Sequence, residues 1–226
     1  MKNSVILTGN KGLIGSAIEE FLRNNNYEVI GLDIETKLDI SDNVKKIMNL
    51  YNKPKHLINT FALNDHIEKN KINYSPIDSP LENFRKYLEI NVTSLYSVCR
   101  EFIKTRPSGT IINFSSIYGL LTPNPKIYEK NSPKDIGYPV SKSAVISLSN
   151  YLAVHYAPNF RINTLVLGGI QNKQPDAFIE KYSDAVPLKR MMQKEELLPS
   201  IMFLLDPKNS YMTGSTLSID GGYSLI

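Results

Sequence analysis

The feature that most constrains the fold is the alternation of short apolar segments with longer segments in which apolar residues recur every three to four positions. The short segments are almost continuously apolar, as in strands covered by helices on both faces. They comprise residues 4–8, 27–33, 55–62, 110–116, 160–168 and 215–220. The helical period is found over residues 13–25, 41–51, 81–106, 138–157 and 192–205. This order predicts an α/β fold, a doubly wound parallel sheet in a single domain spanning residues 1–226.

One predicted connection is too short for a helix. Only five residues separate Asp33 from Asp39, whereas a helical crossover between parallel strands needs about 12. A strand at residues 38–40 would therefore be very short and reached by a loop.

Composition excludes several classes of protein. With 42% apolar and 21% charged residues, the 226-residue chain has ordinary globular composition. Its apolar stretches fall short of the roughly 18 residues that a membrane span needs, and no signal segment precedes the first strand. These features predict a cytoplasmic protein that does not bind a membrane.

Cysteine and histidine point away from disulfide and metal chemistry. The single cysteine, Cys99, excludes an internal disulfide, and its apolar helical setting predicts a buried packing residue. The three histidines, His56, His66 and His155, are scattered along the chain. We therefore predict no metal site.

The charge balance is mildly basic. The net charge is +4, but the chain has no block of Lys and Arg and no regular aromatic–basic pattern of the kind that marks a nucleic-acid groove. The balance suits an anionic small molecule, and no nucleic-acid partner is expected.

A glycine-rich turn follows the first predicted strand. In "ILTGNKGLIGSAI", Gly9, Gly12 and Gly15 precede an apolar helix, which favours close approach of backbone N–H groups to a pyrophosphate. Asp33 ends the next strand, where a carboxylate can accept hydrogen bonds from a ribose 2′-hydroxyl. The pattern predicts a Rossmann-like dinucleotide site. The alternative is a loop with turn glycines and a solvated Asp33.

A tyrosine and a lysine share one face of a predicted helix. Tyr138 and Lys142 lie four positions apart at the start of the segment 138–157, where Pro139 is tolerated in the first turn. The same spacing at Tyr51 and Lys55 is interrupted by Pro54, so that pair is not expected to share a helix. Spacing alone leaves open whether Tyr138 and Lys142 are an acid–base pair or an ordinary surface pair.

The order of these motifs resembles the short-chain dehydrogenase/reductase family along essentially the whole chain. "TGNKGLIG" resembles its glycine-rich turn and "INFSSIYG" the strand that carries its serine, which selects Ser116 over Ser115. "NVTS" resembles the segment with the family's asparagine, here Asn91. Tyr138 and Lys142 match the family's Tyr-x-x-x-Lys, and "LSIDGGY" matches its C-terminal signature.

Other segments match less closely. "LDI" resembles the acid-containing turn beside the adenine, whereas "NTFA" keeps only the first residue of the family's Asn-Asn-Ala-Gly. "RINTLVLGGI" resembles the segment that wraps the nicotinamide, with Leu167 where a proline is usual. Together with the glycine-rich turn, the resemblance predicts cofactor contacts from Gly9, Lys11, Gly12, Leu13, Ile14, Gly15, Asp33, Asp39, Ile40, Asn59, Ala62, Tyr138, Lys142, Gly168 and Ile170.

The resemblance also implies catalytic roles. Tyr138 would be the acid–base, because a nearby ammonium and a positive nicotinamide favour the phenolate and lower the pKa of tyrosine. Lys142 would also hold the nicotinamide ribose, Ser116 would hydrogen-bond the reacting oxygen, and Asn91 would anchor a water that leads protons from Lys142 to solvent. Asn91 as a polar residue inside a helix and Ser116 as an ordinary serine at a strand end remain the alternatives.

The expected activity is an oxidoreductase that interconverts an alcohol and a ketone with NAD(H). Asp33 followed by Ile34 favours NAD, although Lys11 lies where members that bind the phosphate of NADP often carry a basic residue.

The expected substrate is a sugar or sugar-nucleotide. The 21 residues between Ser116 and Tyr138 exceed what the family usually has there, and residues 63–80 form a second long polar segment. We expect residues 118–136 to help build the substrate site, with Tyr118 and Tyr128 stacking on a sugar or base. A substrate phosphate would meet the lysines of this segment, which are Lys126, Lys130 and Lys134.

The composition of this segment is similar to that of family members from surface-polysaccharide and nonulosonate pathways. A 3-oxoacyl reductase and a non-catalytic dinucleotide sensor are the alternatives. A sugar-nucleotide epimerase or dehydratase shares the glycine spacing, but it normally needs a substantial C-terminal substrate domain.

Assembly into a homodimer or homotetramer is expected. The helices predicted at 81–106 and 138–157 carry apolar residues on more than one face. These residues are Leu95, Val98, Phe102, Leu148, Leu152 and Val154.

Overall fold

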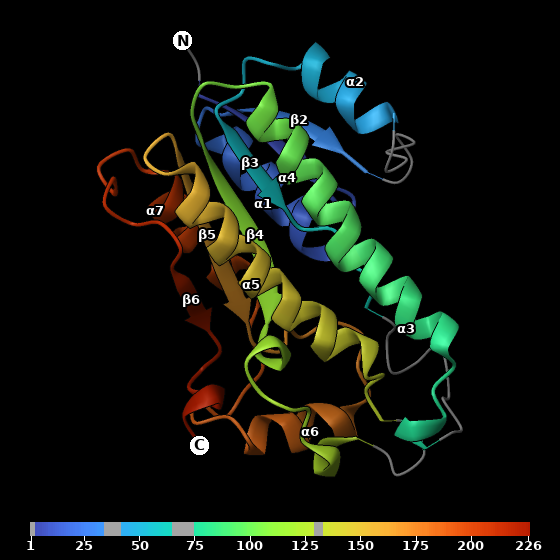
Figure 1. The fold of residues 1–226 in the computed structure, drawn as a ribbon. Coiled ribbons are helices and arrows are strands. Elements are labelled where there is room, and N and C mark those ends of the chain that lie inside the picture. The colour runs from blue at the N-terminus through green and yellow to red at the C-terminus, as the bar shows by residue number, and fades with distance from the viewer. Residues whose placement is uncertain (1–2, 34–41, 65–74, 129–132) are drawn as a thin grey trace.

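A parallel sheet forms the centre of the molecule. The computed structural model describes residues 3–33, 42–64, 75–128 and 133–226. Within them, six parallel strands lie in the order β2-β1-β3-β4-β5-β6 (Figure 1). They are β1 (Ser4–Thr8), β2 (Glu28–Leu32), β3 (His56–Asn59), β4 (Gly109–Ser116), β5 (Phe160–Leu167) and β6 (Thr216–Ile219). The predicted doubly wound sheet is confirmed.

Helices cover both faces of the sheet, as Figure 1 shows. One face packs against α2 (Asp42–Leu50), α4 (Leu95–Lys104) and α5 (Gly137–Tyr156), the other against α1 (Leu13–Asn24) and α7 (Leu198–Leu205). Successive residues of β1 show the alternation, because Ile6 belongs to the first core while Val5 and Leu7 belong to the second. Burial on both faces explains why the strand sequences are continuously apolar.

Two predicted helices differ in detail from the structure. The helix predicted at 81–106 consists of α3 (Leu81–Leu88), a π-helical segment (Glu89–Ser94) and α4. The helix predicted at 192–205 is a 3₁₀ segment (Lys194–Leu197) followed by α7. A further helix, α6 (Asp176–Asp184), was not predicted, because its nine residues hold too few apolar side chains to display a helical period. The possible strand at 38–40 lies outside the described residues.

A chain of buried polar side chains crosses the sheet. The Thr8 hydroxyl donates to Asn59 Oδ1 (2.9 Å), Asn59 Nδ2 donates to Asn113 Oδ1 (2.8 Å), and Asn113 Nδ2 donates to the Ser149 hydroxyl (2.9 Å). Ser149 in turn donates to the Val145 carbonyl. These residues come from β1, β3, β4 and α5, and each side-chain contact satisfies a polar group that burial would otherwise make costly.

Most of the side chains expected at a subunit interface lie in the core instead. Leu95, Val98, Phe102 and Leu152 are buried and Leu148 is half-buried, whereas Val154 is 77% exposed. The broad apolar surface of α4 and α5 is therefore used mainly against the sheet and against neighbouring helices. Of the six residues that motivated the expectation, Val154 alone remains on the surface.

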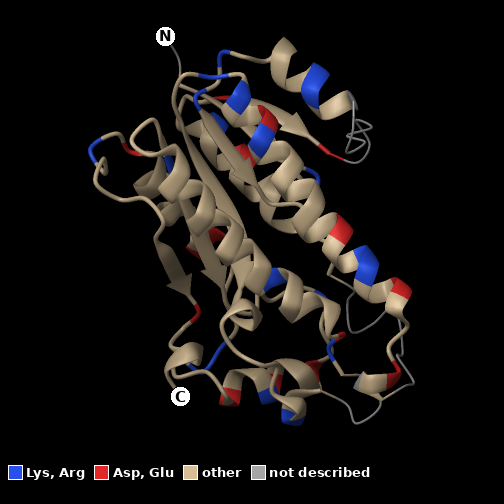
Figure 2. Ribbon diagram, viewed as in Figure 1, with Lys and Arg blue, Asp and Glu red and all other residues tan. Residues whose placement is uncertain are grey.

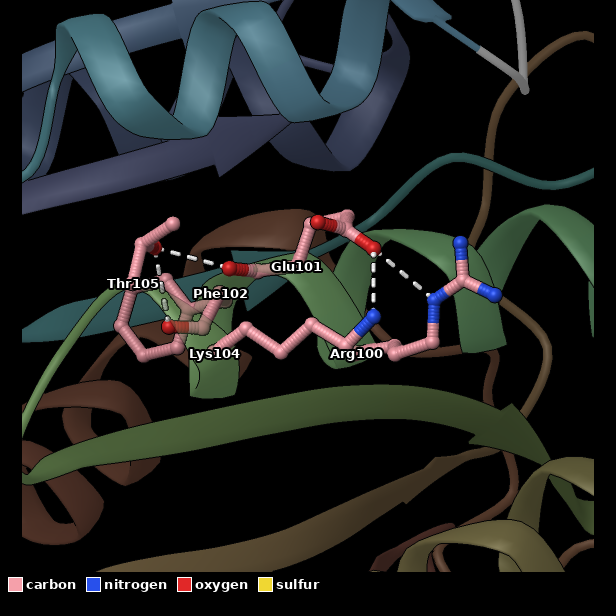
Figure 3. A network of polar contacts seen from close by, with 5 residues as sticks. All are labelled: Arg100, Glu101, Phe102, Lys104 and Thr105. Atoms are coloured by element: carbon pink, nitrogen blue, oxygen red, sulfur yellow. Dashed lines mark hydrogen bonds and ion pairs between the residues drawn. The ribbon is translucent and has the colours of Figure 1, made fainter.

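Charged residues are dispersed over helices and loops. Figure 2 shows Lys and Arg interspersed with Asp and Glu, without gathering on one side of the ribbon. On α4, the buried Glu101 carboxylate binds Arg100 Nε at 2.9 Å and Lys104 Nζ at 3.4 Å (Figure 3). The Thr105 hydroxyl donates to the Glu101 carbonyl and closes the last turn of the helix.

Among the described residues, no helix is both long and apolar enough to cross a membrane.

Candidate active site

A cavity of about 780 Å³ opens at the carboxyl ends of the strands. Residues that end or follow β1, β2, β3, β4 and β5 line it, including Gly9, Asp33, Ala62, Ser116 and Gly168. In a doubly wound sheet this edge is where loops from neighbouring strands diverge and leave room for a ligand.

The glycine-rich turn forms one end of the cavity. Gly9 has φ = +76°, and a Cβ there would lie 2.6 Å from the Phe61 backbone nitrogen. A Cβ on Gly15 would lie 2.1 Å from the Gly9 carbonyl oxygen. There is therefore no room for a side chain at either position. This lets the turn pack closely against the chain after β3 and against the first turn of α1.

The first turn of α1 is suited to an anion. Gly12 precedes the helix, provides no side-chain cap and lines the cavity, and the first turn of α1 contains no acidic residue. The first N–H groups of a helix have no intrahelical acceptor and lie at the positive end of the helix dipole. Asp33 lies beside this turn and accepts a hydrogen bond from the Lys11 amide at 2.9 Å.

Three of the four predicted catalytic side chains, those of Ser116, Tyr138 and Lys142, meet in the cavity wall. Ser116 ends β4, while Tyr138 and Lys142 occupy successive turns at the start of α5. Tyr138 and Ser116 are hydrogen-bonded through their side chains. Lys142 Nζ donates to the Phe114 carbonyl at 3.0 Å and lies 5.9 Å from the centre of the Tyr138 ring. The Tyr51–Lys55 pair, in contrast, is divided between the residue after α2 and the residue before β3.

Burial dominates the acid–base properties of the pair. It raises the pKa of Tyr138 above its usual value, and the hydrogen bond with Ser116 opposes this rise only in part. Burial also lowers the pKa of Lys142 to about 8, assisted by the positive charge of Lys134. The pKa of Tyr138 is therefore raised and not lowered as expected, because burial disfavours the charged phenolate.

Asn91 has a different environment from the other three residues. It lies in the π-helical segment, and its carboxamide both accepts from the Leu63 amide (2.7 Å) and donates to the Leu63 carbonyl (3.1 Å). It also donates to the Ser141 hydroxyl. The side chain thus ties the segment after β3 to α5 and does not line the cavity.

Most of the predicted cofactor residues line this one cavity. They are Gly9, Lys11, Gly12, Leu13, Ile14, Gly15, Asp33, Ala62, Tyr138, Lys142, Gly168 and Ile170. Asn59 does not, because its buried amide is engaged by Thr8 and Asn113 in the polar chain across the sheet. Asp39 and Ile40 lie outside the described residues.

An aromatic wall completes the cavity. Tyr118 and Tyr128 do line it, but both are buried and the Tyr128 hydroxyl donates to that of Tyr118 at 2.9 Å. Phe178 and Tyr182 of α6 extend the wall and were missed, although two aromatic residues four positions apart were the available signal. Lys134 also lines the cavity; the exposed Lys126 does not, and Lys130 lies outside the described residues.

The residues present fit a nicotinamide dinucleotide. The side-chain-free turn and the uncapped start of α1 suit a pyrophosphate, and Asp33 suits a ribose hydroxyl. Ser116 lies at the end of β4, which is three strands away from β2, and Tyr138 and Lys142 of α5 line the same cavity. The cavity therefore contains both a region suited to a nucleotide and the candidate catalytic side chains.

Comparisons with known proteins agree with this geometry. A family model described as enoyl-(acyl carrier protein) reductase matches residues 3–224. The chain is 35% identical over 127 residues to the post-translational flagellin modification protein A of Campylobacter coli, which covers 55% of this chain and 50% of that protein. It is 33% identical over 150 residues to a 3-oxoacyl-[acyl-carrier-protein] reductase of Chlamydia muridarum, covering 62% and 56%. These matches span about half the length of the curated relatives.

Among solved structures, a short-chain dehydrogenase from Leptospira borgpetersenii with bound NAD⁺ superposes with a TM-score of 0.83. The two chains are 26% identical, and the superposition covers 99% of this chain and 93% of the other.

Proposed function

This chain belongs to the short-chain dehydrogenase/reductase family, and from that membership we propose that it is an oxidoreductase that interconverts an alcohol and a ketone with NAD(H). The observation that carries the proposal is the convergence of Ser116, Tyr138 and Lys142 on the cavity that the glycine-rich turn also lines.

The protein's part in the reaction is to hold the substrate oxygen and move its proton. Ser116 and Tyr138 share a hydrogen bond, so a substrate oxygen placed between them can receive a hydrogen bond from each. In alcohol oxidation Tyr138 must start as the phenolate, whose oxygen accepts the substrate O–H proton while the carbon–oxygen double bond forms. The bound nicotinamide supplies the acceptor for the hydride that leaves the same carbon. Ketone reduction is the reverse.

Lys142 supports both steps by its position. Its ammonium lies near the Tyr138 ring and is fixed by the Phe114 carbonyl. A positive charge at this distance stabilises the phenolate that forms when the proton leaves. We propose that Lys142 also holds the nicotinamide ribose, and that Asn91 acts through Leu63 and Ser141, by keeping the segment after β3 against α5.

We propose NAD(H) rather than NADP(H) as the cofactor. Asp33 lies at the end of β2 beside the glycine-rich turn, where its carboxylate would repel a 2′-phosphate. The relative from Leptospira borgpetersenii was solved with NAD⁺.

For the substrate we propose a sugar or sugar-nucleotide. The cavity wall includes the hydroxyl-bearing rings of Tyr118 and Tyr128 and the side-chain amide of Asn172, which offer polar contacts to the hydroxyl groups of a sugar. The relative from Campylobacter coli, a flagellin modification protein, is consistent with this proposal. The second candidate, a 3-oxoacyl reductase, is favoured by the Chlamydia muridarum relative.

Turnover with competing substrates tests both candidates. Purified protein would be supplied with NAD⁺ and a panel of sugars and nucleotide sugars, and separately with NADH and a 3-oxoacyl thioester, while NADH absorbance is followed. We expect turnover with a member of the sugar panel. Turnover of the thioester alone would replace the sugar proposal, and NADH binding without any turnover would favour a dinucleotide sensor.

A further inference from the structure

The segment that follows β5 lines the cavity with backbone and not with long side chains. Gly168, Gly169 and Ile170 come directly after the strand, and all three line the cavity. They belong to the stretch that is expected to contact the nicotinamide. How firmly this backbone is held therefore determines how firmly the nicotinamide can be held.

Hydrogen bonds from other parts of the chain fix this segment. The Met192 amide donates to the Gly169 carbonyl at 2.9 Å, and Gln174 Nε2 donates to the Ile170 carbonyl at 2.8 Å. The Gly169 amide donates to a side chain, the hydroxyl of Tyr182, at 2.5 Å. Through that hydroxyl, α6 is connected directly to the cavity-lining backbone.

The Tyr182 ring is itself held in place by its neighbours. It is 3% exposed, and it stacks on Tyr223 at 5.2 Å and on Phe178 at 6.0 Å between ring centres. A Cβ on Gly169 would lie 2.7 Å from this ring, so the backbone passes directly against it. A side chain packed this closely offers its hydroxyl at one well-defined position.

The contact between Tyr182 and Gly169 lies at the catalytic end of the cavity. The last residue of β5, Leu167, is paired with Ser116 of β4, so the segment begins beside the catalytic serine. The glycine-rich turn follows β1, which lies three positions away from β5 in the sheet. A dinucleotide that spans the cavity would therefore meet the segment held by Tyr182 at one of its ends only.

We propose that Tyr182 is a positioning residue for the nicotinamide, because its hydroxyl holds the Gly169 amide and thereby fixes the backbone against which the nicotinamide lies. This inference rests on the proposed function, since it concerns the cofactor of that same site. Without the hydroxyl, the Gly169 amide loses its acceptor and the segment gains freedom. That freedom would have to be lost again when the nicotinamide binds, which weakens binding at this end.

Binding of two related nucleotides tests the proposal without a substrate. The full chain would be titrated by calorimetry with NADH and separately with ADP-ribose, which carries the adenosine, the pyrophosphate and the second ribose but no nicotinamide. Tyr182→Phe removes the hydroxyl and keeps the stacked ring.

Tyr223→Phe is the matched control. Tyr223 is buried and stacks on the same ring, but it does not line the cavity. Among the described residues, no hydrogen bond joins its hydroxyl to residues 168–171.

We expect Tyr182→Phe to bind NADH more weakly than wild type by roughly fivefold or more, the effect of losing one hydrogen bond. Its affinity for ADP-ribose should stay within about twofold of wild type, because the glycine-rich turn is unchanged. Tyr223→Phe should bind both nucleotides as wild type does.

Three results would overturn the proposal. An equal loss of affinity for NADH and ADP-ribose would show that Tyr182 supports the fold of the whole cavity and not the nicotinamide end. Unchanged NADH affinity in Tyr182→Phe would show that the segment keeps its position without the hydroxyl. A selective loss of the same size in Tyr223→Phe would assign the effect to ring packing. Failure of wild type to bind NADH would contradict the proposed function itself, and this inference with it.

Discussion

The phenol of Tyr138 is subject to two opposing influences. Burial disfavours its charged form, whereas the Ser116 hydrogen bond and neighbouring positive charges favour it. Burial prevails and raises the pKa of Tyr138, so the proton stays on the oxygen at neutral pH. The positive charge of a bound oxidised nicotinamide would shift this balance toward the phenolate, which links proton transfer to the presence of the cofactor.

Replacement of Tyr138 by phenylalanine isolates the role of the hydroxyl group. Tyr138→Phe keeps the ring that packs against Tyr87 but removes the proton, so we expect turnover to fall by at least about 10²-fold. NADH affinity, measured by fluorescence titration, should be nearly unchanged. Tyr51→Phe, which alters a tyrosine outside the site, should have no effect. Near-normal turnover by Tyr138→Phe would exclude Tyr138 as the acid–base.

The lowered pKa of Lys142 predicts a dependence of stability on pH. Because folding lowers this pKa from 10.5 to about 8, the ammonium destabilises the folded state most below pH 8, and the penalty disappears as the pH rises from 8 to 10.5. Its size is roughly 3 kcal/mol. Lys142→Met should therefore compare more favourably with wild type at pH 7 than at pH 10. The difference in unfolding free energy between the two proteins should change by about 2 kcal/mol or more between these pH values.

Urea unfolding of both proteins at the two pH values measures that change. A stability difference between Lys142→Met and wild type that is the same at pH 7 and pH 10 would contradict the prediction. Turnover of the variant should be lost at both values.

Cofactor choice should depend on Asp33. Asp33→Ala removes the carboxylate that accepts from the Lys11 amide and that would repel a 2′-phosphate. We expect wild type to have a higher kcat/KM with NAD(H) than with NADP(H). The ratio of the two values should be about tenfold smaller in the variant, equivalent to about 1.4 kcal/mol. A wild-type preference for NADP(H) would overturn the assignment of the cofactor.

At the scale of elements, the start of α5 sets the position of Tyr138. The Asp135 carboxylate accepts from the Gly137 amide and from the Ser79 hydroxyl, each at 2.7 Å. Gly137 lies directly against α3, since a Cβ there would be 2.6 Å from the Tyr87 ring. The first turn of α5 is thus held by the Asp135 carboxylate, two residues before Gly137, and packs against a neighbouring helix.

Gly137→Ala should displace this turn. The added methyl overlaps the Tyr87 ring, and such overpacking typically costs 1–3 kcal/mol. We expect lower turnover and lower thermal stability, whereas Ser147→Ala on the exposed side of α5 should change neither. In a Tyr87→Ala background the cost of Gly137→Ala should shrink, which a double-mutant cycle measures. Equal costs in both backgrounds would show that the contact with Tyr87 is not responsible.

The sequence predicted the elements whose pattern is local. The β1–turn–α1 unit and α5 were recognised because apolar period, glycine spacing and the position of Pro139 all agree. The π-helical segment before α4 was not, since one extra residue in a turn barely disturbs a helical period. Asn59 was misjudged for a related reason: at a strand end, sequence does not reveal whether an amide faces the cavity or its neighbours in the core.

At the scale of the whole molecule, the state of assembly remains a prediction. Val154 and Tyr151 leave apolar surface exposed on α5, and we expect a dimer or tetramer. Light scattering at micromolar concentration should return at least twice the chain mass of 25.5 kDa. Val154→Asp should weaken the assembly if α5 forms the interface, and a monomeric wild type would refute the prediction.

The polar chain from Thr8 through Asn59 and Asn113 to Ser149 has a consequence for how this sequence can change over time. Each amide both donates and accepts within the chain. Replacing Asn59 or Asn113 by an apolar residue therefore leaves the facing group of the other amide with only a weak contact to the Cys99 sulfur, at a cost of about 1–3 kcal/mol. Joint replacement of Asn59 and Asn113 removes the donor and the acceptor of their hydrogen bond together. Substitutions here should therefore occur together among descendants, and the single-step intermediates should be rare.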